Sequence, residues 1–139
     1  MGRMGNTFGS QGFSKTHSRI VWREVKDQFP AGGVVDNLAA WLTGGKGKIP
    51  AGTFCKWEHD ANKGKIVTCY TDAQIAAAED IASLGINGAT LYDIDIEAGE
   101  TVGTATVIYA GEYYSFMAKA ATLAKVKDLP ALSEIKFVI

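Results

Sequence analysis

Short runs of alternating apolar and polar residues dominate the hydrophobic pattern of this chain. Period-two alternation is typical of half-buried strands, and residues 20–25 (IVWREV) show it, with Ile20 and Trp22 on the same side. Residues 53–58 and 65–70 are rich in β-forming residues and flank a run of Asp, Asn and Gly. This arrangement predicts a β-hairpin.

Two segments follow a helical pattern instead. Residues 34–42 place apolar side chains at helical spacing, which predicts a helix ending at Gly44, with a strand as the alternative for Val34 and Val35. Thr71 is followed three positions later by Gln74, the pattern of a capping box, and good helix formers run from residue 73 to residue 84.

The last third of the chain alternates between strand and turn patterns. We expect strands in residues 89–97, 104–109, 112–117 and 133–139, with turns at 98–101 and 110–111. Strands at this short spacing, combined with one or two small helices, predict a mainly β fold of the small β-barrel or sandwich type.

Two copies of Pro-Ala-Gly, at residues 30–32 and 50–52, each precede a β-rich run. Pro fixes φ and Gly permits a sharp bend, so each copy is expected to be a corner from which a strand starts. The first corner predicts a boundary between an extended N-terminal arm, residues 1–28, and a β-rich domain, residues 29–139.

Charge is distributed unevenly along the 139 residues, although the net charge is only −1. Residues 66–118 contain no Lys or Arg, whereas residues 1–23 contain four basic residues and no acid. Such an uneven distribution of charge affects which partners a protein binds more than which fold it adopts. Four positive charges without interleaved stacking groups give a weak phosphate-binding surface, so nucleic acid is not an expected partner. No apolar run approaches the length that spans a bilayer, so a membrane is not expected either.

Candidate catalytic chemistry is sparse. The sharpest group is Asp93, Asp95 and Glu97, whose period-two spacing puts three carboxylates on one strand face where Ca²⁺ or Mg²⁺ could bind. The alternatives are a solvated strand face or a docking patch for arginines. His17 and His59 lie in no recognisable ligand or nucleophile motif. We expect no enzyme activity and no cofactor.

The cysteines and the aromatic residues each allow two interpretations. Cys55 and Cys69 lie on opposite strands of the predicted hairpin, where buried thiols are favoured over a disulfide in a reducing compartment. The aromatic residues suggest either a carbohydrate-binding platform or core packing and subunit contact. They are Trp22, Trp41, Trp57, Tyr113, Tyr114 and Phe116.

Residues 49–139 resemble the head fibre and decoration proteins of tailed phages, especially those of phages that infect Bacteroides-type hosts, including crAss-like phages. The resemblance is carried by a strand start at IPAGTFCKW, a hairpin, a G-I-x-G-x-x-x-x-D stretch from Gly85 to Asp93, a V-x-x-x-G-x-Y stretch from Val107 to Tyr113, and the closing LPALSEIKFVI. Residues 1–48 have no counterpart in this pattern.

The resemblance implies a β-tulip-like fold, similar to that of the head decoration protein of lambda-type phages, and a structural role without an active site. Such a protein binds the capsid exterior of the virion, bridges and stabilises subunits of the major capsid protein, and in one variant anchors a head fibre. Its expected partners are the major capsid protein, further copies of itself in a trimer, and other head fibre or auxiliary capsid proteins.

On this interpretation, residues 1–28 bind the capsid surface and the end of the domain binds sister copies. The expected capsid-binding residues are Arg3, Phe8, Phe13, Lys15, Arg19, Trp22 and Arg23. The expected self-association residues are Tyr113, Tyr114, Phe116, Phe137, Val138 and Ile139. The alternatives are a carbohydrate-binding surface module and a soluble β-barrel domain of another role.

Overall fold

The computed structural model describes residues 20–97 and 102–139. The turn expected at 98–101 lies outside these residues, as do residues 1–19 of the expected arm. The strands are β2 (Trp22–Gln28), β3 (Gly33–Val35), β4 (Leu42–Thr43), β5 (Lys46–Ile49), β6 (Phe54–Asp60), β7 (Gly64–Cys69), β8 (Gly88–Thr90), β9 (Ile94–Ile96), β10 (Thr104–Ala105), β11 (Val107–Tyr114) and β12 (Ile135–Val138). The helices are α2 (Asp72–Ala77) and α3 (Ala120–Val126), and the 3₁₀ turns are η2 (Leu38–Trp41), η3 (Ile81–Leu84), η4 (Ser115–Met117) and η5 (Pro130–Leu132).

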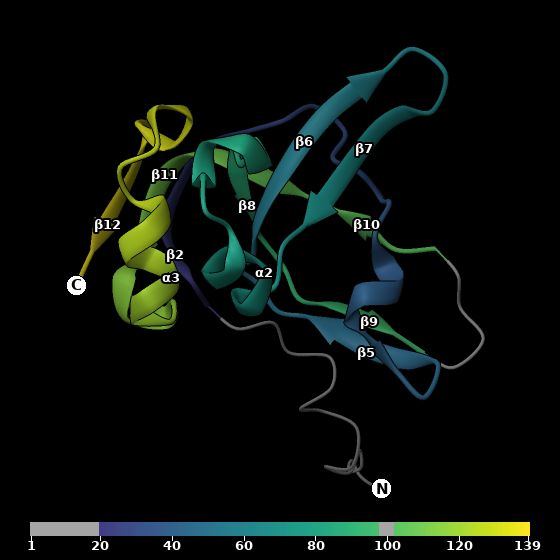
Figure 1. Cartoon of the computed structure of the whole chain (residues 1–139). Coiled ribbons are helices and arrows are strands. Elements are labelled where there is room, and N and C mark those ends of the chain that lie inside the picture. The colour runs from purple at the N-terminus through teal and green to yellow at the C-terminus, as the bar shows by residue number, and fades with distance from the viewer. Residues whose placement is uncertain (1–19, 98–101) are drawn as a thin grey trace, which may run out of the picture.

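Two sheets organise the described residues (Figure 1). The larger sheet has the order β10-β3-β7-β6-β8-β11-β12, with β2 also pairing with β11. It curls into half a barrel. The smaller sheet has the order β4-β5-β9. The prediction of a mainly β fold of the small barrel or sandwich type is confirmed.

Strand β11 is paired along both of its edges. β2 runs antiparallel along one edge, while β8, which pairs with the start of β11, and the parallel strand β12 share the other edge. The turn predicted at 110–111 is therefore wrong, because the ladder continues through it with register shifts that mark a bulge. A Cβ atom at Gly111 would lie 2.4 Å from the carbonyl oxygen of Glu24, so the neighbouring backbone requires glycine there.

Strand β2 confirms the strand expected at 20–25, but it overturns the domain boundary. Residues 22–28 form an integral strand of the larger sheet, so the body of the protein includes part of the expected arm. Val21 and Trp22 are both buried, so the expected pairing of Ile20 and Trp22 on one face is wrong. The Trp22 indole donates to the carbonyl oxygen of Thr90 at 3.0 Å and packs edge-on against Tyr113.

Both Pro-Ala-Gly corners start strands as expected. β3 begins at Gly33, directly after the first corner, where Ala31 takes a φ of 61° that is rare for a residue with a side chain. β6 begins at Phe54, two residues after the second corner.

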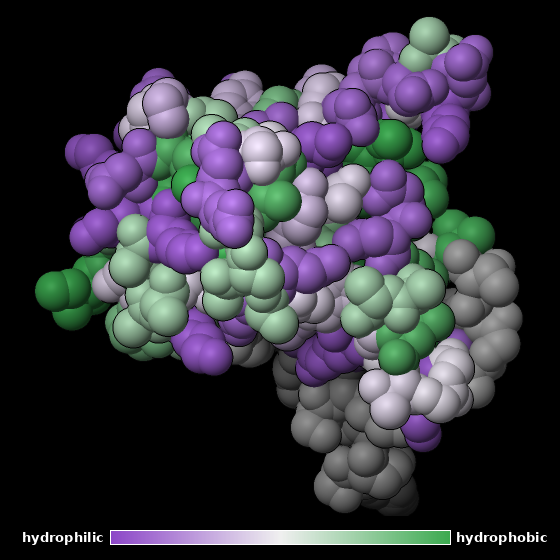
Figure 2. Space-filling view, viewed as in Figure 1, coloured by the Kyte–Doolittle hydropathy of each residue, from purple (hydrophilic) through white to green (hydrophobic). Residues whose placement is uncertain are grey.

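The hairpin of β6 and β7 confirms the predicted pair of strands. Its turn is held by the Asp60 carboxylate, which accepts hydrogen bonds from the backbone N–H groups of Asn62 and Lys63 at 2.7 and 2.9 Å. The hairpin projects from the body, and its tip is hydrophilic (Figures 1 and 2).

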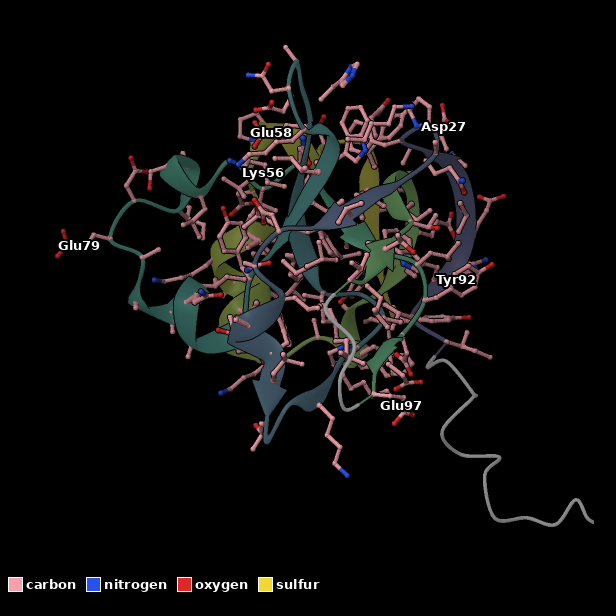
Figure 3. The ribbon with its side chains drawn as sticks, turned by 90° about the vertical axis from the view of Figure 1, so that its right-hand side faces the viewer. Asp27, Lys56, Glu58, Glu79, Tyr92 and Glu97 are labelled. Atoms are coloured by element: carbon pink, nitrogen blue, oxygen red, sulfur yellow. The ribbon has the colours of Figure 1, made fainter. Side chains whose placement is uncertain are left out.

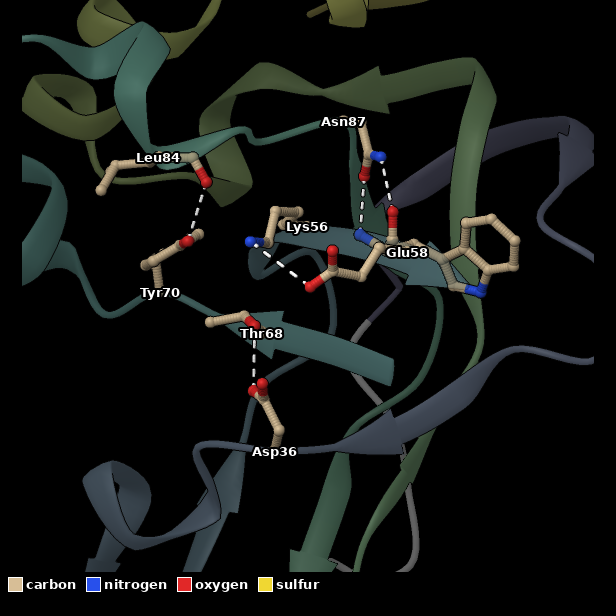
Figure 4. Close-up of polar contacts among 8 residues, drawn as sticks. Asp36, Lys56, Glu58, Thr68, Tyr70, Leu84 and Asn87 are labelled. Atoms are coloured by element: carbon tan, nitrogen blue, oxygen red, sulfur yellow. Dashed lines mark hydrogen bonds and ion pairs between the residues drawn. The ribbon is translucent and has the colours of Figure 1, made fainter. Parts of the chain in front are cut away.

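Two asparagine side chains extend strand pairing beyond the ends of short strands. Asn87, just before β8, accepts from the backbone N–H of Trp57 and donates to its carbonyl oxygen, both at 2.8 Å (Figure 4). Asn37, just after β3, makes the same pair of bonds with the backbone of Cys69. Each side-chain amide therefore makes the two hydrogen bonds that the backbone of one further strand residue would make.

The helical segments differ from expectation. The helix predicted over 34–42 is wrong: Val34 and Val35 pair with β10 and β7, so the strand alternative holds and only η2 is helical. The capping box at Thr71 is confirmed, but α2 ends at Ala77 and η3 follows after a break. Helix α3 was not predicted. It packs against α2, and the Lys125 ammonium donates to three carbonyl oxygens at the C-terminal end of α2, those of Ile75, Ala76 and Ala78.

The core consists of two clusters. One surrounds Tyr113 and includes Trp22 and Phe54 under the two helices. The other lies between the two sheets and includes Ile49 and Val67. Cys55 and Cys69, directly opposite each other on β6 and β7, are buried free thiols in this second cluster, as expected. Burial raises the pKa of the Cys55 thiol well above its usual range.

Candidate functional site

Three strands of the larger sheet meet at one end of the molecule. β2 starts there, while β11 and β12 end there: Tyr114 pairs with Val138, and its backbone N–H donates to the carbonyl oxygen of Val21 at 2.8 Å. The next residue outward on β2 is Ile20, which is 76% exposed, and the last residue after β12 is Ile139, which is fully exposed. Large apolar side chains therefore lie at this end of the molecule, where β2 starts and β11 and β12 end.

We call this surface the strand-end patch and define it by Ile20, Tyr114, Phe116, Val138 and Ile139. The Phe116 side chain is 67% exposed and its ring lies 5.3 Å from that of Tyr114. A shallow hollow between η4 and α3 borders the patch and is lined by Phe116, Leu123 and Ala124. The C-terminal end marked in Figure 1 is hydrophobic in Figure 2. Exposed apolar patches of this kind commonly bind another protein.

The expected self-association residues divide into two groups. Tyr113 is 1% exposed and its hydroxyl donates to the carbonyl oxygen of Gly52, so its assignment to subunit contact is wrong. Phe137 packs against Phe54 and Tyr113 in the core, so it too is chiefly a core residue. Tyr114, Phe116, Val138 and Ile139 lie together on the strand-end patch.

The expected capsid-binding residues are also divided. Trp22 is a core residue, so its assignment as a surface anchor is wrong. The reason is that the sheet buries it between Thr90 and Tyr113. Arg23 forms an ion pair with Glu112 on the neighbouring strand at 3.3 Å, and its side chain is 59% exposed. Arg3, Phe8, Phe13, Lys15 and Arg19 lie outside the described residues.

The three acidic residues proposed as a metal site do not form one. The Asp93 side chain is 4% exposed and turns inward, where Oδ1 accepts from the Ala51 N–H at 2.6 Å and Oδ2 lies 3.2 Å from the Lys48 ammonium. Asp95 and Glu97 are exposed, and Glu97 points outward (Figure 3). Residues 20–97 and 102–139 contain no group of three metal-ligating side chains. Asp93 instead fixes the second Pro-Ala-Gly corner.

The three carboxylates do not share a face because the chain passes from one sheet to the other within the predicted strand 89–97. β8 belongs to the larger sheet and β9 to the smaller one, so the chain bends between them and period two is broken. Tyr92, at the bend, is 59% exposed and points outward (Figure 3), whereas an unbroken strand over 89–97 would place it on the same face as Ile94 and Ile96.

The tryptophans proposed for a sugar platform are half-buried and hydrogen-bonded. The Trp41 indole donates to the carbonyl oxygen of Cys69 at 3.3 Å, and that of Trp57 donates to Gly32 at 2.8 Å. Trp57 also stacks on Phe29, with the ring centroids 4.5 Å apart and nearly parallel. Both side chains pack against the second core cluster, which accounts for them as packing residues.

A polar pair lies beside this aromatic cluster. The Tyr109 hydroxyl donates to the Asp27 carboxylate at 2.5 Å, which joins β11 to β2 at the surface. The hydrogen bond lowers the pKa of Asp27 and raises the pKa of Tyr109, because it favours the charged carboxylate and the neutral phenol.

A deeper hollow of about 590 Å³ lies between α2, η4 and the segment 50–54. We call it the α2–η4 cavity. Its walls are mostly apolar, with Asp72 and Lys119 as the charged residues of the lining, and they include Trp41, Phe54, Ile75, Tyr113 and Met117. Its volume lies within the range of ordinary ligand pockets. Sequence reasoning missed this cavity because its walls come from four segments that are distant in the chain.

Comparison with known proteins found no match: no family model, no curated protein and no solved structure matches this chain. The part of the chain that the structure describes contains no helix long and apolar enough to cross a membrane.

Proposed function

We propose that this chain is a structural protein of a tailed-phage head, which binds the outer surface of the capsid and bridges subunits of the major capsid protein. The observation that carries the proposal is that the leader, residues 1–19, joins the body inside the strand-end patch, at Ile20. The chain therefore connects a basic segment directly to an exposed apolar surface, and each has the chemistry to bind a protein partner.

The basic segment and the apolar patch contribute different interactions. Arg3, Lys15 and Arg19 can form charge-assisted hydrogen bonds with shell carboxylates, which fix orientation. The apolar patch contributes burial, which supplies most of the free energy of stable protein contacts. Binding the mature shell in preference to the immature one would stabilise the particle.

The positions that carry the resemblance to decoration proteins each have a structural role here. A Cβ atom at Gly88 would lie 2.8 Å from the carbonyl oxygen of Ile108, Gly111 faces the backbone of Glu24, and Tyr113 is the largest fully buried side chain. A shared pattern at such positions supports a shared fold, and the proposal extends it to a shared role.

We further propose that sister copies meet at the patch, in a three-fold arrangement. Among the described strands, β12 pairs only with β11, so its outer edge is open to another strand. In this arrangement the assembled copies could also hold a head fibre or another auxiliary capsid protein.

The test is binding to purified shells of the major capsid protein that lack this chain. The full chain is expected to bind to saturation, at a copy number comparable with that of the shell subunits. A variant lacking residues 2–19 is expected to bind at least about tenfold more weakly, a loss of about 1.4 kcal/mol. The truncation must stop at residue 19, because β2 and the core residues Val21 and Trp22 follow.

A matched control keeps the length of the leader and reverses its charge, in R3E/K15E/R19E. This variant is expected to bind weakly as well, with a difference from the full chain that shrinks as salt rises. Unchanged occupancy of the truncated chain would contradict the role of the leader. Failure of the full chain to bind any shell would contradict the proposed function.

A further inference from the structure

The two cysteines of the chain, Cys55 and Cys69, lie directly opposite each other on β6 and β7 of the hairpin (Figure 1). Both side chains are fully buried in the second core cluster. A hydrogen bond joins the two thiols, so no other side chain separates their sulfur atoms. The fold therefore holds a matched pair of thiols that the proposed function does not use.

The backbone of this pair has the geometry that a cross-strand disulfide requires. The N–H and C=O groups of Cys69 bond to the Asn37 side chain, and the Cys55 carbonyl oxygen accepts from the Asn87 N–H. These groups point away from the partner strand, so Cys55 and Cys69 are a non-hydrogen-bonded pair of the ladder. The Cα atoms of such a pair lie about 4.5 Å apart. A disulfide spans Cα distances of about 4.4 to 6.8 Å, so it can close here with little backbone movement.

The two strands that carry the thiols are already fixed in position. β3 pairs with β7 on one side of the hairpin, and β8 pairs with β6 on the other. The Cys69 carbonyl oxygen also accepts from the Trp41 indole at 3.3 Å. Because the folded chain has already lost this conformational freedom, a bond between residues 55 and 69 would mainly restrict the unfolded chain.

We propose that Cys55 and Cys69 form a disulfide in the folded protein when it leaves a reducing environment, and that this bond stabilises the fold. The structure shows the reduced form of the pair. Disulfides persist in oxidising surroundings and are rare in reducing ones. A protein made in a reducing compartment would therefore gain the bond only after its release. This inference does not rest on the proposed function, because it concerns the isolated chain.

The oxidant in this reaction is a low-molecular-weight disulfide, and glutathione disulfide serves as the probe. One cysteine thiolate attacks a sulfur atom of the probe, which forms a mixed disulfide and releases one glutathione thiolate. The other cysteine thiolate then attacks the cysteine sulfur of the mixed disulfide and releases the second glutathione. The two cysteines lose two electrons, the probe gains them, and the two thiol protons pass to the released glutathione thiolates.

Burial makes the reaction slow. Both thiols are 0% exposed, so the probe reaches them only through local opening of the hairpin. Burial, together with the hydrogen bond to Cys69, also raises the pKa of the Cys55 thiol well above its usual range. Since the thiolate is the attacking species, we expect the rate of oxidation to rise with pH.

The test incubates the reduced full chain with glutathione disulfide under native, mildly alkaline conditions. Mass spectrometry without reductant is expected to show a monomer lighter by two hydrogen atoms, with Cys55 and Cys69 joined in a peptide digest. The Tm of the oxidised protein should lie at least about 5 °C above that of the reduced protein, and a reductant should reverse the shift.

The matched controls are C69A and C55A/C69A, in which no bond within the chain can form. C69A should take up at most one glutathione, C55A/C69A should keep its mass, and the probe should raise the Tm of neither. For wild type, two thiols that stay free, or a mixed disulfide or a dimer as the main product, would overturn the proposal. So would an oxidised protein whose Tm equals or falls below that of the reduced protein. The wild-type comparison does not need the variants to fold, and shell binding by the reduced chain tests the proposed function separately.

Discussion

Two glycines of this protein share a backbone conformation and differ in their surroundings. Gly52 has a φ of 81° and Gly64 a φ of 80°, a region that residues with a Cβ atom adopt only under strain. Nothing lies within 4 Å of a Cβ atom built on Gly64, whereas one on Gly52 would collide with Val21 and Tyr113. The pair therefore separates backbone strain from packing.

We expect G64A to lower the free energy of unfolding by about 1–2 kcal/mol, from backbone strain alone. G52A should cost about 1–3 kcal/mol more, because the added methyl group displaces core side chains and disturbs the Tyr113 hydrogen bond. Urea unfolding of both variants measures the difference. Equal losses of unfolding free energy in the two variants would show that Val21 and Tyr113 can move to accommodate the added methyl group without further cost.

The hydrogen bond from Tyr109 to Asp27 gives stability a dependence on pH. The folded state lowers the pKa of Asp27 below its ordinary 3.8, so its contribution is present above that value and is lost as pH falls through the lowered pKa. It is also lost at alkaline pH, as pH rises through the raised pKa of Tyr109.

Y109F should therefore be less stable than wild type at neutral pH, and the two curves should converge below the lowered pKa of Asp27. Thermal unfolding as a function of pH measures this. D27N is the matched control, because it removes the same titration from the other partner. A difference between wild type and Y109F that persists unchanged at pH 2 would contradict the assignment.

At the scale of the elements, asparagine side chains complete strands that are too short. Asn87 satisfies both backbone groups of Trp57 at the position just before β8 begins. N87A should lower the free energy of unfolding by about 1–3 kcal/mol, because it leaves these partly buried groups without partners. N87D should be no better, because its carboxylate faces the Trp57 carbonyl oxygen.

The control is N62A in the hairpin turn, where only the backbone of Asn62 is used, and its effect should stay within about 0.5 kcal/mol. Urea unfolding compares the variants. If N87A is as harmless as N62A, water replaces the amide and the side chain does not extend the strand.

Elements held by local interactions were predictable, and those held by distant ones were not. The hairpin depends on the turn around Asp60 and the start of α2 on the capping box at Thr71, so both follow from neighbouring residues. The apolar spacing of residues 34–42 favours a helix locally, but pairing with β7 and β10 decides for a strand. The bulge at Gly111 likewise depends on β2, more than eighty residues away.

At the scale of the whole molecule, the strand-end patch is the surface where we expect sister copies to meet. The double variant F116E/I139E places two charges in that patch and should shift the protein to the monomer in analytical ultracentrifugation. V102E is the matched control, because Val102 is also apolar and 62% exposed but lies next to β10. An unchanged sedimentation coefficient of F116E/I139E, or an equal shift with V102E, would contradict self-association at the patch.

The sequence by itself determined the mainly β class, the hairpin, the Pro-Ala-Gly corners and the basic character of the leader, because each depends on a few adjacent residues. The tertiary structure decided which aromatic residues are core and which are surface: Trp22 and Tyr113 are buried, and Phe116 remains exposed. It also left Ile20 exposed at the strand-end patch. These outcomes depend on strand order and register. Segments that are distant in the chain decide which side of each strand is buried, and local periodicity does not determine this.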